Sequence, residues 1–373
     1  MRRPTLPSLD ESSSLSDASE RSNDLSMKCK VQMNSLTDPD TSGSKSDKSA
    51  ATTDVVDDAP PYRTRTLIVL LIGYFVLHLP TWESLDAVAT VDTFTHVNFE
   101  SLPLSVVIAF RLSMAATMLG NACQVFLYGK WEADTDYVPG SKLQKVKKIA
   151  FRGALQPDGN LFSGLQCVST FTLWCWMVDG TSFLLAGMIP LVNVVLPSII
   201  IPSWVLRTAM ILWETSAPVS ILVSAVVKYA LWPMAQEHGE NVKLLKATGA
   251  LLQHNLNSVA ALVEVGLMGG LPVVQGHFAF PAIYGILYLL FSYAMMYSWA
   301  DRSAGAQFFY PFFDTTLGIM TSLAIVALLA ILTLSFGIFC AAEHVLTHAE
   351  DYVALVPLAA IVLLSQSVCR VRD

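Results

Sequence analysis

The chain has 373 residues, of which 53% are hydrophobic and only 14% carry a charge. An average soluble domain has about a quarter charged residues, so this composition excludes an ordinary soluble globular protein. The formal net charge of −7 argues against nucleic-acid binding, which needs a basic surface to neutralise phosphates.

Residues 1–62 differ in composition from the rest of the chain. This segment is rich in Ser, Thr, Asp and Lys and has scarcely any aromatic or long apolar run. Such a sequence cannot bury enough apolar surface to offset the entropy lost on ordering. We therefore predict a disordered Ser/Asp-rich tail, followed by a transmembrane helical domain over residues 63–373. The tail lacks the apolar core of a signal peptide, so the first internal apolar segment is expected to target the membrane.

Apolar stretches long enough to cross about 30 Å of hydrocarbon recur after residue 65. They predict an all-α, polytopic transmembrane bundle of about eight spans. The expected spans are 66–82, 104–128, 163–187, 207–232, 247–268, 278–299, 316–340 and 352–369. Residues 188–203 are also apolar, but Pro190, Pro197 and Pro202 argue against a straight helix. We expect an interfacial or re-entrant connection there.

The positions of Lys and Arg predict the orientation, because short cytoplasmic loops retain positive charge. Residues 1–65, the tail with the start of the first span, have nine of these residues, loop 129–162 has six, loop 233–246 has two and loop 300–315 has one. The intervening loops have none: 83–103, 188–206, 269–277 and 341–351. Arg370 and Arg372 follow the last span. The alternation predicts a multi-pass protein of the endoplasmic reticulum or plasma membrane with both termini, and hence the tail, in the cytosol.

Ionisable side chains inside the spans are costly and therefore mark candidate functional positions. They are Arg111, Asp179, Glu214, His254 and Glu264. Glu214 and Asp179 are both candidate partners for Arg111 in a buried ion pair that would fix helix packing.

Two of the expected spans carry a polar face. His254, Asn257 and Ser258 stand at i, i+3 and i+4 of a helix, and Glu264 falls only about 80° away. In another span, Thr172 and Asp179 are two turns apart. If both helices enter from the cytosolic side, Thr172 and His254 lie about 10–14 Å deep and can meet in one layer. A hydroxyl beside an imidazole is the minimum apparatus for nucleophilic acyl transfer.

Three motifs, in this order, resemble the androgen-induced protein family of multi-pass membrane hydrolases. They are Phe171-Thr172-Leu173-Trp174-Cys175-Trp176 with Phe183-Leu184-Leu185, then His254-Asn255-Leu256-Asn257 with Glu264, then Tyr310-Pro311-Phe312-Phe313-Asp314. The resemblance covers about residues 165–340. It does not extend to the tail, the leading span, residues 188–203 or the last helix.

The resemblance implies a lipid-ester hydrolase that cleaves fatty acid esters, including those of hydroxy fatty acids. By position, Thr172 matches the family's threonine nucleophile, and His254 matches its histidine, ten residues before the acidic Glu264. The side chains expected to support the cavity are Asn257, Ser258, Glu264, Asp179 and Trp176. The expected partners are the lipid bilayer and a lipid ester; no cofactor or metal is required, and the sequence does not define an oligomeric state.

Two other interpretations remain open at the level of sequence. The first is a non-enzymatic protein, transporter-like or receptor-like, in which His254, Asn257, Glu264 and Asp179 line a polar path. The second is a metal site formed by His344 and His348 with neighbouring acids, since this spacing can bind a divalent ion on a helix. No Gly-x-Ser-x-Gly and no His-Glu-x-x-His motif is present.

Overall fold

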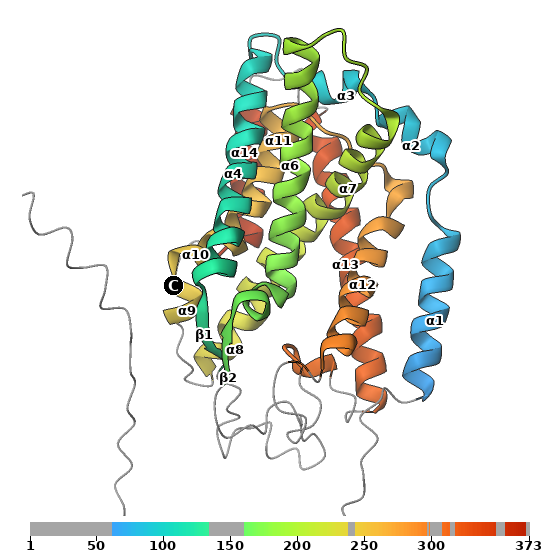
Figure 1. Ribbon diagram of the computed structural model, residues 1–373, viewed down its shortest axis with the longest axis vertical. Coiled ribbons are helices and arrows are strands. Elements are labelled where there is room, and N and C mark those ends of the chain that lie inside the picture. The colour runs from blue at the N-terminus through green and yellow to red at the C-terminus, as the bar shows by residue number, and fades with distance from the viewer. Residues whose placement is uncertain are drawn as a thin grey trace, which may run out of the picture. The chain divides into compact units, whose positions relative to one another are not determined.

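Helices make up nearly all of the described structure (Figure 1). The computed structural model describes residues 62–133, 160–237, 243–296, 298, 308–313, 318–347 and 355–370. Apart from Tyr62, the expected disordered tail lies outside these residues. The elements are α1 (Tyr62–Leu77), α2 (Trp82–Val88), α3 (Val91–Thr95), α4 (Leu104–Tyr128), β1 (Lys130–Ala133), β2 (Asn160–Ser163), α6 (Phe171–Val195), α7 (Ser203–Val226), α8 (Trp232–Glu237), α9 (Lys243–Lys246), α10 (Thr248–Leu251), α11 (Asn257–Leu267), α12 (Ala279–Met295), α13 (Ile319–Thr347) and α14 (Leu355–Val368).

Five of the described helices are long and apolar enough to cross a membrane. They are Leu104–Tyr128, Phe171–Val195, Ser203–Leu231, Gln275–Met295 and Ile319–Thr347. A sixth span is obtained if Arg63–Leu77 and Trp82–Thr95, which are bent by 62° relative to each other, count as one broken span. The expected all-α transmembrane bundle is therefore confirmed. Each of the eight expected segments contains a helix or a run of helices, but two of them fall short of a full span: 247–268 is divided among α10, Leu252–Leu256 and α11, and α14 has only 14 residues.

The connection expected at 188–203 is wrong for its first half, because α6 continues through Pro190 to Val195. Proline lacks the N–H that would bind the carbonyl four residues earlier, here that of Ala186. In this structure Arg111 Nη1 donates to that carbonyl at 3.0 Å. The side chain of a neighbouring helix thus replaces the missing backbone hydrogen bond, so the helix can pass the proline.

Helices α4 and α6 pack closely along a stripe of glycines. A Cβ atom at Gly180 would lie 2.9 Å from Met118 Cβ, and one at Gly187 would lie 2.9 Å from Leu112 Cδ2. Small residues at such positions let two membrane helices approach each other. The loop that follows α4 continues into β1, which pairs antiparallel with β2. This short pairing lies within the 129–162 loop of the sequence prediction.

Arg111 is the polar centre of the bundle and is fully buried. Its Nη2 lies 2.6 Å from Glu264 Oε1, and its Nε donates to Glu264 Oε2 at 3.1 Å. Its Nη1 also donates to the carbonyl of Phe94 at 2.6 Å. The sequence had offered Glu214 or Asp179 as partner, but the carboxylate that binds Arg111 is that of Glu264 on α11. Gly269 lies against the guanidinium and leaves no room for a larger residue.

A cap of short segments closes the end of the bundle near α2 and α3 (Figure 1). Asn98 Nδ2 donates to the Val265 carbonyl at 2.6 Å, and the Asn98 N–H donates to that of Met268 at 2.8 Å. Trp213 Nε1 donates to the Leu271 carbonyl at 3.2 Å. The bonds from Asn98 satisfy carbonyl groups that the end of α11 would otherwise leave unpaired.

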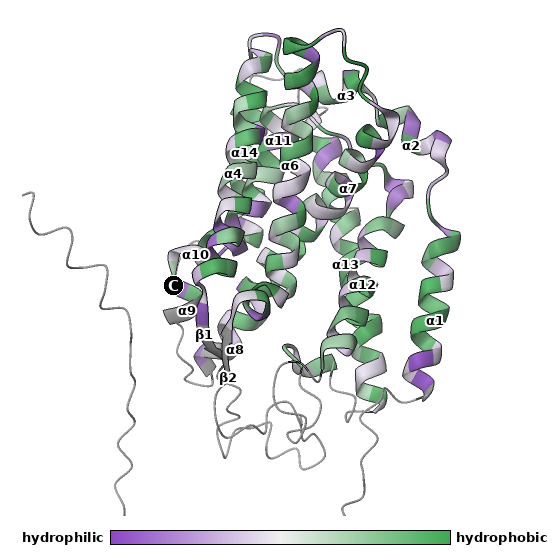
Figure 2. Cartoon of the chain, viewed as in Figure 1, coloured by the Kyte–Doolittle hydropathy of each residue, from purple (hydrophilic) through white to green (hydrophobic). Residues whose placement is uncertain are grey.

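The long helices are mostly apolar in sequence (Figure 2), and many of their large apolar side chains are exposed. Leu77 is 85% exposed and Leu363 is 66% exposed, and many others on α1, α13 and α14 resemble them. Soluble monomers rarely carry such extensive apolar surface. The exterior therefore fits the hydrocarbon of a membrane.

We predict that Glu264→Gln strongly destabilises the protein, because it leaves the guanidinium charge of Arg111 buried without a counter-charge. Breaking a buried pair in this way costs about 3–5 kcal/mol. Thermal unfolding in detergent would show a lower midpoint than that of the wild type. Glu100→Gln, which changes an exposed carboxylate, serves as the matched control. Equal midpoints for the two variants would show that the ion pair does not stabilise the bundle.

Candidate functional site

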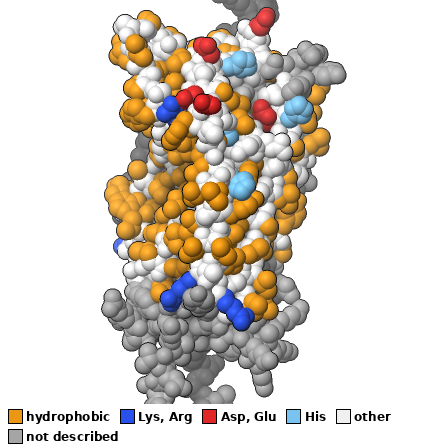
Figure 3. All heavy atoms as spheres, turned by 90° about the vertical axis from the view of Figure 1, so that its right-hand side faces the viewer, with side chains coloured by type: hydrophobic (Ala, Val, Ile, Leu, Met, Phe, Trp, Pro, Cys, Tyr) orange, Lys and Arg blue, Asp and Glu red, His pale blue; other side chains and the backbone are white. Residues whose placement is uncertain are grey.

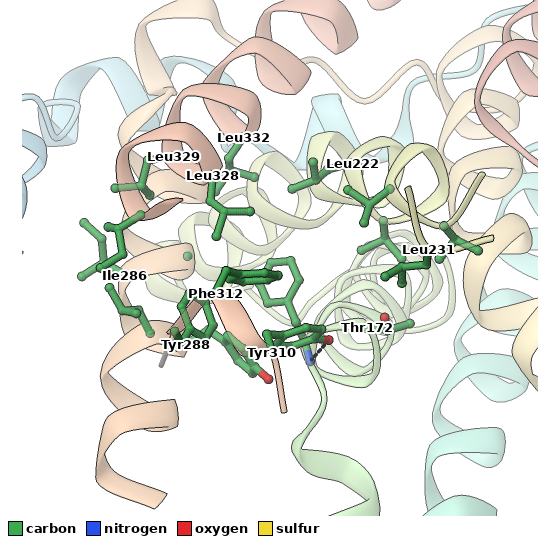
Figure 4. Close-up of a pocket in the computed structure, with 18 residues that line it drawn as sticks. Thr172, Leu222, Leu231, Ile286, Tyr288, Tyr310, Phe312, Leu328, Leu329 and Leu332 are labelled. Atoms are coloured by element: carbon green, nitrogen blue, oxygen red, sulfur yellow. Dashed lines mark hydrogen bonds between the residues drawn. The ribbon is translucent and has the colours of Figure 1, made fainter. Parts of the chain in front are cut away.

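An apolar cavity lies where the start of α6 meets α7, α12 and α13 (Figure 4). Its empty volume is about 830 Å³, which includes space open to the surroundings. The lining residues are Phe171, Thr172, Leu222, Val223, Val226, Val227, Leu231, Gly285, Ile286, Tyr288, Leu289, Tyr310, Phe312, Phe313, Ile325, Leu328, Leu329 and Leu332.

Thr172 stands at the polar edge of this cavity. Among the lining residues it carries the one aliphatic hydroxyl, and the other polar side chains there are Tyr288 and Tyr310. The structure places Thr172 second in α6, because residues Gly164–Ser169 form a 3-10 turn and Thr170 caps the helix. The sequence had placed it about nine residues into its span. Thr172 therefore belongs to the half-buried first turn of the helix, where backbone N–H groups have no intrahelical partner.

Tyrosine hydroxyls organise this edge of the cavity. The Phe171 N–H donates to the Tyr310 hydroxyl at 3.2 Å, and the Tyr288 hydroxyl donates to the Ser169 carbonyl at 3.0 Å. Figure 4 shows Tyr310 beside Thr172. Burial raises the pKa of Tyr310, which lies outside the spanning helices, to about 12. Its hydroxyl keeps its proton at neutral pH, as that of an unperturbed tyrosine does, and can act as a hydrogen-bond donor.

His254 lies in a π-helical stretch, Leu252–Leu256, between α10 and α11. Its carbonyl accepts a hydrogen bond from Ser224 Oγ of α7 at 2.5 Å. Ser224 Oγ is also 2.6 Å from Ser258 Oγ, and Ser258 Oγ donates to the Ser220 carbonyl at 2.8 Å. Asn257 Oδ1 accepts from the Ser258 N–H at 2.9 Å. The polar face predicted from the sequence thus ties its helix to a row of serines on α7.

His254 is not among the residues that line the cavity. The cavity takes Val223, Val226 and Val227 from α7, whereas His254 contacts the neighbouring Ser224. The cavity lining and the His254 carbonyl therefore meet adjacent residues of α7. That the side chains of Thr172 and His254 face each other stays a prediction.

Trp176 and Asp179, two other expected support residues, are buried inside the bundle. Neither carboxylate oxygen of Asp179, nor Trp176 Nε1, has a hydrogen bond of normal geometry among the described residues. Asp179 lies beside Ser216 of α7. Neither Trp176 nor Asp179 lines the cavity, and Glu264 also lies elsewhere, in the ion pair with Arg111.

The structure also reveals polar groups that reading the sequence missed. Tyr310 belonged to a recognised motif but was given no role. His277 was assigned to a short outer loop, yet it is buried and its Nδ1 lies 2.6 Å from Glu214 Oε2. The sequence signal for this histidine was the short polar segment Gln275-Gly276-His277. The partners of His277 are distant in the sequence, so the sequence alone did not identify them.

The suggested metal site at His344 and His348 is only partly visible, since His348 lies outside the described residues. In the part of the chain that the structure describes, no group of three or more His, Cys, Asp or Glu side chains could hold a metal ion.

Comparisons of the chain with protein-family models, with curated proteins and with solved structures find no match. The fold itself defines a polytopic helical membrane protein. The comparisons assign no activity to the chain.

Proposed function

We propose that the protein is an integral membrane lipid-ester hydrolase with Thr172 as nucleophile and His254 as general base. The observation that carries this proposal is that Thr172, the position matched by the family's threonine, borders an apolar cavity. The rest of the lining is aliphatic and aromatic, which suits an acyl chain, and the hydroxyls gather at one edge, which suits an ester group.

The chemistry would follow the usual course of acyl transfer. Thr172 Oγ1 attacks the ester carbonyl carbon while the His254 imidazole accepts the hydroxyl proton. The protonated imidazole then gives its proton to the departing alkoxide, and an acyl ester of Thr172 remains. Water, deprotonated by the same imidazole, releases the fatty acid. The Tyr310 hydroxyl, which lies beside Thr172, is suited to donate a hydrogen bond to the carbonyl oxygen as it gains charge.

The resemblance and the structure support this proposal independently. Thr172 matches the family's threonine by its sequence context alone. In the structure, the same residue borders the apolar cavity. In the non-enzymatic alternative, Glu264 would line a solute path, but its carboxylate is engaged by Arg111. The geometry therefore favours the hydrolase.

We predict that Thr172→Ala nearly abolishes hydrolysis of lipid esters by the purified protein. Thr172→Ser should keep part of the activity, because serine retains the oxygen and loses only a methyl group. His254→Ala should lower the rate about 10²-fold or more, the usual contribution of a positioned base. The measurement is fatty acid release from a panel of lipid esters in detergent.

Thr181→Ala is the matched control, since this threonine lies on the same helix and donates to the Met177 carbonyl. Full activity of Thr172→Ala or His254→Ala would contradict the mechanism. A folded wild type that cleaves no ester would support the non-enzymatic alternative.

We also propose that both termini are cytosolic. Arg63 and Arg65 begin α1, whereas Glu83, Asp92 and Glu100 belong to the cap at the other end of the bundle. Figure 3 shows Asp and Glu side chains toward the upper end of one face, with a basic side chain among them, and further Lys and Arg side chains at the lower end of the same face. Arg207 at the upper end is paired with Asp86. Positive charge at the ends of short loops favours the cytosolic side.

We predict that a glycosylation tag inserted in loop 83–103 is modified in microsomes, whereas a tag at either terminus is not. Gel mobility before and after glycosidase treatment reports the modification. A glycosylated N-terminal tag would reverse the orientation.

A further inference from the structure

A second group of side chains with hydrolytic geometry lies in the cap at the other end of the bundle. His277 Nδ1 is 2.6 Å from Glu214 Oε2, and His277 Nε2 is 2.9 Å from Ser84 Oγ. The imidazole of His277 thus links Ser84 on one side to Glu214 on the other. A serine, a histidine and a carboxylate in this order are the arrangement that activates a hydroxyl for nucleophilic attack.

The carboxylate is held firmly in place. Glu214 is fully buried in α7, and its second oxygen, Oε1, accepts the Val274 N–H at 2.9 Å. His277 is buried as well, and its ring packs edge-to-face on Phe280. Both oxygens of Glu214 are therefore used to fix the segment that carries the histidine. The imidazole has one orientation available to it.

The hydrogen-bond directions follow from the charge of Glu214. When its carboxylate is ionised it can only accept, so His277 Nδ1 carries the proton that faces Glu214. In the neutral imidazole, Nε2 then holds a lone pair directed at Ser84 Oγ. The Ser84 hydroxyl donates to it, which is the state needed for the imidazole to remove the proton.

Ser84 is the exposed member of the group, while His277 and Glu214 are buried behind it. Ser84 lies on α2, and its N–H donates to Thr81 Oγ1 at 3.2 Å. Apolar side chains surround this position in sequence: Trp82 is 65% exposed and Leu77 and Leu79 precede it on the outside. Exposed Trp beside polar groups is typical of the boundary between membrane and water. A substrate that reaches Ser84 would therefore come from the membrane surface.

We propose that Ser84, His277 and Glu214 form a second hydrolytic centre, distinct from Thr172, for amphiphilic carboxylic esters at the membrane surface. Ser84 Oγ forms a bond to the ester carbonyl carbon, and His277 Nε2 takes the hydroxyl proton. The carbon–alkoxide bond then breaks, the alkoxide leaves with the proton from His277, and an acyl ester of Ser84 remains. Water adds to this ester with His277 as base, releasing the acid and restoring the serine. Glu214 acts as a positioning residue.

The experiment uses a fluorophosphonate probe, which labels activated serines covalently, on the full-length chain in detergent. A Thr172→Ala background removes the nucleophile of the other proposed centre, so the two proposals fail separately. Mass spectrometry of the labelled peptide identifies the modified residue. We expect labelling at Ser84 that is absent in Ser84→Ala and about 10²-fold slower in His277→Gln. Ser113→Ala, which changes an exposed serine on α4, is the matched control.

A second measurement guards against loss of folding in the His277 variant. Ser84→Cys, with His277 intact, is alkylated with iodoacetamide between pH 5 and 9 and compared with Ser101→Cys, which changes an exposed serine of the same cap. A thiol beside an imidazole forms its thiolate at lower pH than an isolated thiol does. We therefore expect Ser84→Cys to react at pH 6 at least 10-fold faster than Ser101→Cys. Absence of label on Ser84 in the folded protein, or identical pH profiles for the two cysteines, would overturn the proposal.

Discussion

The buried Arg111 side chain binds three other elements of the fold at once. Its guanidinium meets the Glu264 carboxylate of α11, the Phe94 carbonyl of α3 and the Ala186 carbonyl of α6. A charge in this position costs several kcal/mol unless it is paired and hydrogen-bonded. The helices can therefore adopt only an arrangement that brings these groups together. The same residue permits α6 to continue past Pro190, which sets the length of the helix that begins near Thr172.

This constraint separates the polar interior from the cavity. Glu264 is held by Arg111, and Ser220, Ser224 and Ser258 satisfy one another between α7 and α11. The cavity on the neighbouring side of α7 is left with valine and leucine side chains and with hydroxyls only at its Thr172 edge. An apolar cavity whose hydroxyls gather at one edge suits an acyl ester better than a hydrated solute. The proposed hydrolytic chemistry depends on this division.

The sequence predicts the helices better than it predicts their contacts. Hydropathy identified Leu104–Tyr128 with its observed ends, because a continuous apolar run has a clear boundary on each side. It ended the next span too early at residue 187, because the compensation for Pro190 comes from Arg111 on a different helix. Hydropathy also did not identify Glu264 as the partner of Arg111. The composition of a span shows that a buried charge is costly, but it does not show which side chain lies beside that charge. Ser84 and His277 are 193 residues apart, so only the fold brings them together.

The central claim is that Thr172 opens onto a cavity that holds an acyl chain. Photo-crosslinking with a fatty acid ester that carries a diazirine near the middle of its chain tests this directly. In purified Thr172→Ala protein, the account predicts crosslinks to cavity residues such as Val226, Leu289 and Leu328, and excess unlabelled ester should remove them. Crosslinks confined to outward-facing residues such as Leu70 and Leu363 would contradict it, because the ester would then contact only the lipid-facing surface.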